Sequence, residues 1–453
     1  MMNDTIAAIS TAFGEAAIAV LRLSGRCAVE IAGAVFRGKK SASELSARAA
    51  HFGSIFDGEQ RLDDVLLTVF RAPASYTGED VVEISCHGGV LVSRRILEVL
   101  LRAGARSAEP GEFTQRAFLN RKLDLTQAEA VMDVISAQTD LALRAANEQL
   151  EGRLGARIRD LRAAVLDTLA QVEAYIDFPE EDISPETGAA LRGRIENALA
   201  DVGALLATAG RGKVLREGLR TVIFGAPNVG KSSLLNRLLG YERAIVSKIP
   251  GTTRDVLEET INVRGIPVRL MDTAGIRDSA DEIERVGMER TRRAVEHADV
   301  VLNVVDASSD AAAWERTLAA ADAEAAKKEH TELLVLNKAD LGVHASWHPR
   351  GGTAVSALTG DGFEKLLDAI EHATFGGTAK RDWSVAINAR HQACLERARE
   401  FLRAALTAFD DGLSPEFVAE ELRAAMDAIG DIVGRADTEE LLGVIFGQFC
   451  IGK

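Results

Sequence analysis

The stretch Gly225-Ala226-Pro227-Asn228-Val229-Gly230-Lys231-Ser232-Ser233 decides the fold of the region around it. An apolar run precedes it at 221–224, and a helix-like run follows at 234–239. The pattern G-x-x-x-x-G-K-[ST] between a strand and a helix predicts a phosphate-binding loop, the plainer alternative being a glycine turn before a helix. Glycines let successive N–H groups point at an anion, and the helix N-terminus adds its positive end. We expect Lys231 to reach the β- and γ-phosphates and the Ser232 hydroxyl to ligate Mg2+.

Length and composition predict a globular protein of several domains. A chain of 453 residues is too long for one core, and 47% hydrophobic with 27% charged residues is ordinary for a soluble protein. The formal charge of −15 argues against an extended basic face for nucleic acid. Contact with RNA would then need a confined patch or a partner protein.

The cysteines and the N-terminus predict a cytoplasmic protein. Cys27, Cys86, Cys394 and Cys450 are scattered without a C-x-x-C pair, which favours a reducing compartment and gives no disulfide framework or zinc site. The first residues lack a signal-like pattern, and no apolar run approaches the length of a membrane span.

The first 120 residues predict an α+β domain. Strand patterns at 18–23, 64–70 and 80–85 alternate with helical patterns at 28–36 and 91–103. Arg22, Glu83 and Lys122 are interpreted, from their neighbours alone, as solvent-facing members of alternating patterns. His87, between a strand and two glycines, is either a catalytic group or, as we prefer, part of a turn.

From residue 123 the pattern becomes helical. Thr126 and Glu129 are spaced as a capping box, and an apolar seam runs from Leu150 to Val172. An acidic segment at 177–182 interrupts it, either as a cation site or as a solvated loop, which we prefer. Helical patterns return at 390–409 and after Ser414 and Asp437. We infer one helical domain split by an inserted α/β domain.

Further motifs follow within the strand–helix alternation of about 216–375. An apolar strand leads into Asp272-Thr273-Ala274-Gly275, where the aspartate can hold Mg2+ through water and the glycine N–H can meet the γ-phosphate. The earlier segment 250–255, Pro-Gly-Thr-Thr-Arg-Asp, offers a threonine that closes on the metal only when the γ-phosphate is present. This arrangement would make a switch.

Base selection is assigned to Asn337-Lys338-Ala339-Asp340. The Asp340 carboxylate can accept from the N1–H and amino group of guanine, whereas adenine has no N1–H, so the site favours GTP over ATP. The segment 355–357 offers a backbone N–H for the guanine carbonyl. Order and spacing together indicate a guanine-nucleotide-binding domain that resembles the translation-factor-type GTPases.

One position departs from Ras-like proteins. Ile276 stands where those proteins carry the glutamine that orients the attacking water. Asp281, Glu282 and Glu284 lie just downstream, either as a plain helix surface or as groups that act at the phosphate.

The whole chain resembles the MnmE (TrmE) family of tRNA-modification GTPases. Motifs in every region carry the resemblance, including Leu-Arg-Leu-Ser-Gly at 21–25, Tyr-Thr-Gly-Glu-Asp at 76–80, Pro-Gly-Glu-Phe-Thr at 110–114, Leu-Asp-Leu-Thr-Gln at 123–127 and the terminal Phe-Cys-Ile-Gly-Lys. The resemblance implies a homodimer that acts with the flavoprotein MnmG, as a heterotetramer, on the wobble uridine of certain tRNAs. It implies addition of a carboxymethylaminomethyl-type group at carbon 5.

The resemblance also implies cofactors and their residues. A reduced folate, 5-formyl- or methylene-tetrahydrofolate, would lie among Arg22, Glu83, Lys122 and Lys453. K+ would replace an arginine finger where two GTPase domains pair, held by Asn228, Ser247, Ile249 and Thr252. Ser247 and Pro250 depart from the threonine and alanine usual there, which a site built largely from backbone carbonyls should tolerate. Ser232 and Thr253 would hold Mg2+, Glu284 would position water, and Cys450 would be a functional thiol.

The expected guanine-nucleotide site then comprises Asn228, Val229, Gly230, Lys231, Ser232, Ser233, Ser247, Lys248, Ile249, Pro250, Gly251, Thr252, Thr253, Asp272, Thr273, Ala274, Gly275, Asn337, Lys338, Ala339, Asp340, Ser356, Ala357 and Leu358. The expected domains are an N-terminal folate-binding and dimerisation domain at 1–120, a helical domain at 121–214 and 378–453, and a GTPase domain at 215–377. Two alternatives remain: a GTP-switched assembly factor without one-carbon chemistry, and a folate-dependent transferase whose GTPase is only regulatory.

Overall fold

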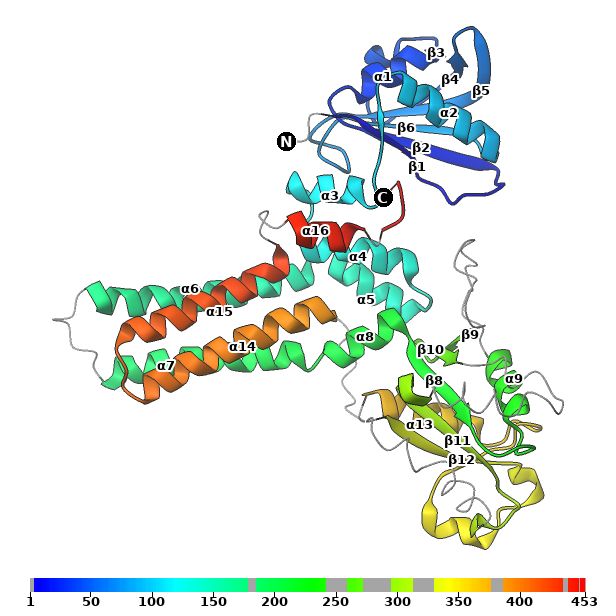
Figure 1. The fold of residues 1–453 in the computed structure, drawn as a ribbon, viewed down its shortest axis with the longest axis vertical. Helices are drawn as coiled ribbons and strands as arrows, with labels where there is room; N and C mark the ends of the chain where they lie inside the picture. The colour runs from blue at the N-terminus through cyan, green and yellow to red at the C-terminus, as the bar shows by residue number, and fades with distance from the viewer. Residues whose placement is uncertain are drawn as a thin grey trace. The chain divides into compact units, whose positions relative to one another are not determined.

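The structure is a computed structural model that describes residues 4–177, 185–241, 259–271, 295–312, 330–375, 386–434, 439–447 and 449–452. The chain divides into two compact units. The first comprises residues 1–132, 150–169 and 426–453, and the second comprises residues 133–149 and 170–425. Each unit is therefore built from segments that lie far apart in the sequence (Figure 1).

A seven-stranded sheet dominates the first unit, in the order β3-β4-β5-β6-β2-β1-β7. Its strands are β1 (Ile6–Ile9), β2 (Ile18–Ser24), β3 (Phe36–Gly38), β4 (Ala50–Asp57), β5 (Gln60–Phe70), β6 (Val81–His87) and β7 (Arg106–Ser107). The helices α1 (Ala28–Val35) and α2 (Val90–Arg102) pack on one face, and a short 3-10 helix, η1 (Ala42–Glu44), lies beside α1. This face carries the larger core, which includes Leu21, Leu67 and Ile84. The predicted α+β domain is confirmed.

The opposite face of this sheet carries a smaller apolar cluster. Ile6 and Ala8 of β1 pack there with Ala108 and with Phe113 of α3 (Glu112–Leu119). Because Ala8 lies opposite Arg22 in the antiparallel register of β1 and β2, Arg22 shares this second face.

The remaining helices of the first unit join the two ends of the chain. Phe118 and Leu125 pack with Leu442 and Phe446 of α16 (Glu439–Phe446) and with Phe449. The helix α4 (Leu125–Ser136) begins one residue before the predicted cap. The Asp124 carboxylate accepts from the Gln127 N–H at 3.0 Å, and the Gln127 side chain accepts from the Asp124 N–H at 3.0 Å. The predicted capping box at Thr126 and Glu129 was therefore wrong by two residues, because Asp124 is the cap.

The predicted apolar seam lies on the buried side of a long helix. Leu154, Ile158 and Leu161 of α6 (Arg153–Asp177) are buried. In the second unit, α7 (Pro185–Leu206) packs against α14 (Ala389–Asp410), and they run antiparallel, since Arg192 near the start of one pairs with Asp410 at the end of the other. The remaining helices outside the second sheet are α5 (Asp140–Leu150), α8 (Ala209–Glu217) and α15 (Pro415–Val433).

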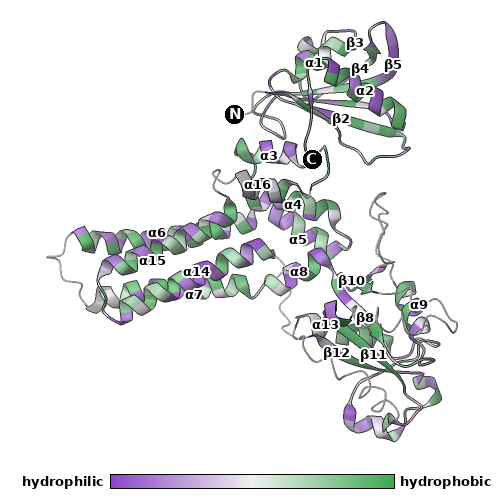
Figure 2. Cartoon of the chain, viewed as in Figure 1, coloured by the Kyte–Doolittle hydropathy of each residue, from purple (hydrophilic) through white to green (hydrophobic). Residues whose placement is uncertain are grey.

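A six-stranded sheet forms the other part of the second unit, in the order β13-β12-β11-β8-β10-β9. Its strands are β8 (Leu219–Phe224), β9 (Glu259–Val263), β10 (Ile266–Met271), β11 (Val300–Asp306), β12 (Thr331–Asn337) and β13 (Thr353–Ala354). All neighbours are parallel except β9 and β10. Figure 2 shows the mainly hydrophobic central strands, as expected for a sheet covered on both faces.

The helices α9 (Lys231–Tyr241) and α13 (Phe363–Phe375) accompany this sheet, together with the 3-10 helices η2 (Ala339–Leu341) and η3 (Ala345–Arg350). Because parallel strands share their carboxyl edge, the loops after β8, β11 and β12 meet at one edge. Of the described helices, none has the length and apolar character to span a membrane.

Candidate functional site

The glycines of the phosphate loop are needed for its backbone path. Gly225 has φ of +153°, and a Cβ there would lie 2.2 Å from the Val304 carbonyl oxygen. Gly230 has φ of +95°, and a Cβ there would lie 2.2 Å from Nδ2 of Asn337. Both the dihedral angles and the close contacts exclude side chains. The loop runs from β8 into α9, so its N–H groups and the helix N-terminus lie at one place, as the motif predicts.

Lys231 folds back over the loop that it belongs to. Its Nζ donates to the carbonyl oxygens of Gly225 and Ala226, both at 2.8 Å. Burial lowers the pKa of the Lys231 ammonium. A partly buried ammonium among carbonyl oxygens is a strong donor for any anion that reaches the loop.

Asn337 joins the phosphate loop to the loop after β13. Its side chain is buried, with Nδ2 donating to the Val229 carbonyl at 2.9 Å and Oδ1 accepting from the Ala357 N–H at 3.0 Å. The Ala339 N–H donates to the Val355 carbonyl at 3.0 Å. These three bonds fix the loops after β8, β12 and β13 to one another.

The structure thus brings the described part of the predicted nucleotide site to one edge of the sheet. Asn228 is exposed in the left-handed region with φ of +62°, while Asp340 is exposed in η2. Ser356 is fully buried, and Leu358 is 81% exposed. Asp340 and Leu358 are thus both exposed in the loops that the Asn337 side chain joins.

Some predicted residues lie outside the described part of the chain. They are Ser247, Lys248, Ile249, Pro250, Gly251, Thr252, Thr253, Asp272, Thr273, Ala274, Gly275, Glu284 and Lys453. The segment that starts at Asp272 directly follows β10, whose carboxyl end lies at the same sheet edge as the phosphate loop.

Arg22 and Glu83 form an ion pair across the first sheet. They are register partners on β2 and β6, and Nη2 of Arg22 lies 2.8 Å from Oε1 of Glu83. The Arg22 guanidinium also lies 5.5 Å from the ring centre of Tyr76 and 5.7 Å from that of Phe113. The solvent-facing interpretation was wrong for Arg22, whose side chain is only 16% exposed, because the alternation faces α3 and the Tyr76 loop rather than water.

Lys122 and the C-terminal tail lie against the same domain. Lys122 is exposed, as the alternation predicted, and its Nζ donates to the Pro73 carbonyl at 3.2 Å. The tail approaches β1, where the Ser10 hydroxyl donates to the Gly452 carbonyl at 3.1 Å. Cys450 is exposed. Gly452 is therefore bound just after the end of β1.

His87 is the last residue of β6 and pairs with Asp63. Its Nδ1 lies 2.7 Å from a carboxylate oxygen of Asp63, and its ring is largely exposed. The His87 main-chain N–H also donates to the other carboxylate oxygen of Asp63, at 2.8 Å. The turn interpretation fits better than a catalytic one.

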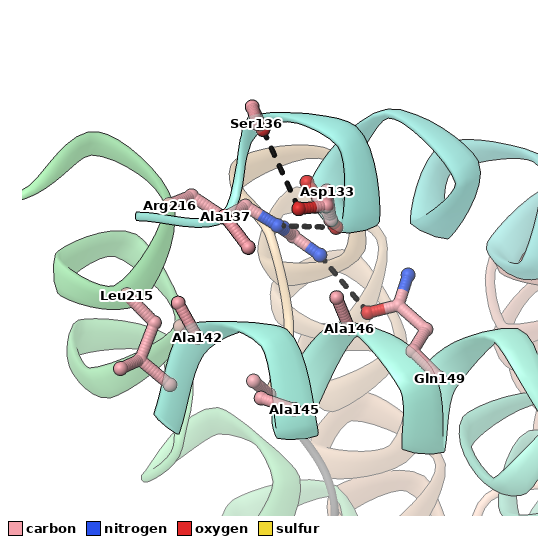
Figure 3. Close-up of a pocket in the computed structure, with 11 residues that line it drawn as sticks. Asp133, Ser136, Ala137, Ala142, Ala145, Ala146, Gln149, Leu215 and Arg216 are labelled. Carbon is pink, nitrogen blue, oxygen red and sulfur yellow. Dashed lines mark hydrogen bonds and ion pairs between the residues drawn. The ribbon is translucent and has the colours of Figure 1, made fainter. Parts of the chain in front are cut away.

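A shallow pocket in the second unit lies apart from the predicted site residues (Figure 3). Alanines of α5 line it, with Arg216 at one side. Arg216 donates from Nε to Asp133 at 2.8 Å and from Nη2 to Gln149 at 3.0 Å. This network ties α4 and α5 to the end of α8, two residues before β8.

Two residues of these sites were missed from the sequence. Asp306, the last residue of β11, lies 2.7 Å from Nζ of Lys338. Tyr76 packs under Arg22. A signal for Asp306 existed, since it ends a strand just as Asn337 ends the next one. No sequence signal placed Tyr76 beside Arg22.

A parallel sheet with a phosphate loop after β8 and Asn-Lys-Ala-Asp after β12 defines a P-loop GTPase domain. Comparison with known proteins extends this to the whole chain. The family model for the N-terminus of the GTP-binding protein TrmE matches residues 5–122, and the MnmE helical domain model matches residues 125–450.

Close relatives match over their full length. The protein called tRNA modification GTPase MnmE in Akkermansia muciniphila is 51% identical over 456 residues, which cover 99% of both chains. Those of the same name in Enterococcus faecalis and Aquifex aeolicus are each 46% identical, with coverage of 100% of this chain and 99% and 100% of theirs. The chain belongs to the MnmE (TrmE) family of tRNA modification GTPases, which are GTP hydrolases involved in tRNA modification. The family implies binding of GTP and Mg2+.

Proposed function

We propose that this chain hydrolyses GTP in a K+-stimulated reaction and, with an MnmG-type flavoprotein, adds a carboxymethylaminomethyl-type group at carbon 5 of the tRNA wobble uridine. The observation that carries the nucleotide-binding part of the proposal is the Asn337 side chain, which bonds both the phosphate loop and the loop at Ala357. Hydrolysis drives pairing and separation of two GTPase domains. The relatives' shared name supports the tRNA role.

The described residues support the proposed nucleotide contacts. The Lys231 ammonium exchanges its two carbonyl acceptors for phosphate oxygens, because charged acceptors bind a buried cation more strongly. The exposed Asp340 carboxylate accepts from the guanine N1–H and amino group. The Ala357 region supplies backbone N–H groups to the guanine carbonyl, held in place by Asn337.

The proposed metal ligands are oxygen donors, which suit hard cations. Ser232, in the first turn of α9, and Thr253 hold Mg2+, which neutralises phosphate charge. Asn228 holds K+ with Ser247, Ile249 and Thr252, and K+ supplies the positive charge of an arginine finger. The exposed, left-handed Asn228 is consistent with a side chain that faces a second GTPase domain. Glu284 positions the attacking water.

The first sheet supports a site for a reduced folate, 5-formyl- or methylene-tetrahydrofolate. Arg22 and Glu83 present a hydrogen-bonding pair beside the Tyr76 ring, which suits a polar, planar pterin. Lys122 and Lys453 supply positive charge for the folate carboxylates. Cys450 belongs to the same C-terminal tail and is exposed, and it supplies a functional thiol.

The proposed domains are a folate-binding and dimerisation domain at 1–120, a helical domain at 121–214 and 378–453, and a GTPase domain at 215–377. The packing of α7 against α14 supports a helical domain assembled from both sides of the GTPase segment. The chain is a homodimer that forms a heterotetramer with its flavoprotein partner. The reaction takes place in the cytoplasm, where tRNA is found.

Hydrolysis in two salts tests the K+ mechanism. The full chain is assayed with saturating GTP and Mg2+ in KCl and in NaCl at equal ionic strength. We expect much faster hydrolysis in K+, together with K+-dependent pairing of the GTPase domains in the presence of GDP and aluminium fluoride. Equal rates in both salts would contradict the mechanism.

Folate binding separates this proposal from a GTP-switched assembly factor. Calorimetry with 5-formyltetrahydrofolate and the full chain should show binding that Arg22→Ala abolishes. Absence of binding by the wild-type chain would favour the assembly factor. Folate-dependent transfer that persists without GTP hydrolysis would favour a transferase whose GTPase is only regulatory.

A further inference from the structure

Asp306 and Lys338 form an ion pair beside the proposed base site. Asp306 ends β11, Asn337 ends β12, and the two are register partners in neighbouring parallel strands. Lys338 follows Asn337, and its Nζ lies 2.7 Å from Oδ2 of Asp306. The side chains are 33% and 23% exposed, so water screens the pair only in part.

Asp306 is itself held rigidly. Its other oxygen, Oδ1, accepts from the Ser308 N–H at 3.0 Å and from the Ser308 hydroxyl at 2.6 Å. Burial raises the pKa of Asp306, but the bonds from Lys338 and Ser308 outweigh burial and lower the pKa overall. The carboxylate is therefore a fixed, charged anchor, with one oxygen for its own turn and one for Lys338.

Lys338 needs such an anchor. Its backbone lies in the left-handed region with φ of +62°, at the turn that leads to Asp340. Asp340 is exposed and only two residues away, and it is the carboxylate that has to accept from guanine. A lysine ammonium without a fixed partner would compete with guanine for the Asp340 carboxylate.

We propose that Asp306 is a positioning residue for guanine recognition. By holding the Lys338 ammonium at the end of β11, it keeps Asp340 available for the base and extends the apolar stem of Lys338 along the side of the base site. This inference rests on the proposed guanine-nucleotide site. It adds a positioning residue that acts through Lys338 rather than through a contact of its own with the base.

The test measures nucleotide affinity and turnover of the full chain with Asp306→Asn. We expect about tenfold weaker binding of both GDP and GTP, the size of one charge-assisted bond, with kcat at saturating GTP within about twofold of wild type. Asp299→Asn is the matched control, since Asp299, just before the opposite end of β11, pairs with Arg220 of β8 at 2.7 Å. It should bind both nucleotides like the wild type.

A double-mutant cycle with Lys338→Met supplies the decisive comparison. Lys338→Met leaves the bonds from Ser308 to Asp306 intact, so it tests the pair even if Asp306→Asn fails to fold. In the Lys338→Met background, Asp306→Asn should cause no further loss of affinity. A further tenfold loss there, unchanged affinity in the folded Asp306→Asn variant, or a loss confined to kcat would overturn the inference. A wild-type chain that binds ATP as well as GTP would instead refute the proposed guanine site.

Discussion

Gly230 is the residue on which the phosphate loop depends most closely. Its φ is +95°, and a Cβ built there would lie 2.2 Å from Nδ2 of Asn337, so the position has no room for a side chain. The Asn337 side chain bonds Val229 and Ala357 from the space that the missing Cβ leaves open. The absence of a side chain at position 230 therefore allows both the backbone turn of the phosphate loop and the Asn337 bonds that join it to the loop at Ala357.

Gly230→Ala should therefore weaken GTP binding strongly. Left-handed strain and displacement of the Asn337 amide together cost about 3 kcal/mol, or roughly 100-fold in affinity. Gly240→Ala, in the helix α9 that follows the loop, is the matched control, since a Cβ there meets nothing within 4 Å. Titration with a fluorescent GDP analogue measures the nucleotide affinity of both variants. Wild-type affinity in Gly230→Ala would contradict this description of the loop.

The helices and strands were largely predictable because their patterns are local. The runs at 222–224 and 300–302 are apolar, and both belong to largely buried parallel strands. The cap of α4 was misplaced because two acidic or hydroxyl residues lie within three positions, and only the backbone decides which one caps. The Arg22–Glu83 pair was not predictable, since the register of β2 and β6 is set by residues that are distant in sequence.

At the scale of helices and strands, Arg216 of α8 links two other helices through Asp133 of α4 and Gln149 of α5. Arg216 is 20% exposed and bonds both Asp133 and Gln149, whereas Arg192 in the α7–α14 pair is 42% exposed. Arg216→Met should lower the free energy of unfolding by about 1–3 kcal/mol, since it removes two hydrogen bonds, one of them charge-assisted, at a largely buried position. Arg192→Met should lower it by at most about 1 kcal/mol.

Urea denaturation followed by circular dichroism measures the free energy of unfolding of the Arg216→Met and Arg192→Met variants. The comparison is informative because both remove an arginine from an ion pair between helices of the same unit. Equal destabilisation by the two changes would show that the buried network adds nothing beyond an exposed ion pair.

At the scale of the whole molecule, the two ends of the chain meet in one unit. Gly452 lies against β1, 442 residues from Ser10, and Pro110 bridges to Ile451. No local pattern predicts a contact of this sequence separation, and the family resemblance alone indicated that the tail and the first domain act together. Because the tail contacts the first domain at Ser10 and Pro110, we include the tail in the proposed folate site.

Gly452→Ala should release the tail. Its φ is +97°, and a Cβ would lie 2.5 Å from the Ile9 carbonyl oxygen. We expect faster removal of the last residues by carboxypeptidase and about tenfold weaker folate binding, with GTP affinity unchanged. Gly443→Ala in α16 is the control, since its Cβ would meet nothing within 4 Å. Trimming of the Gly452→Ala tail at the wild-type rate would contradict the docked position.

In the proposed function, hydrolysis of the GTP that the phosphate loop binds drives wobble-uridine modification. The most direct measurement is nucleoside analysis of tRNA from a strain that lacks this protein, complemented with the wild type, Gly230→Ala or Gly240→Ala. We predict that the carbon-5 modification is lost in the deletion strain and restored by the wild type and Gly240→Ala, but not by Gly230→Ala. Persistence of the modification in the deletion strain, or full restoration by Gly230→Ala, would contradict the claim.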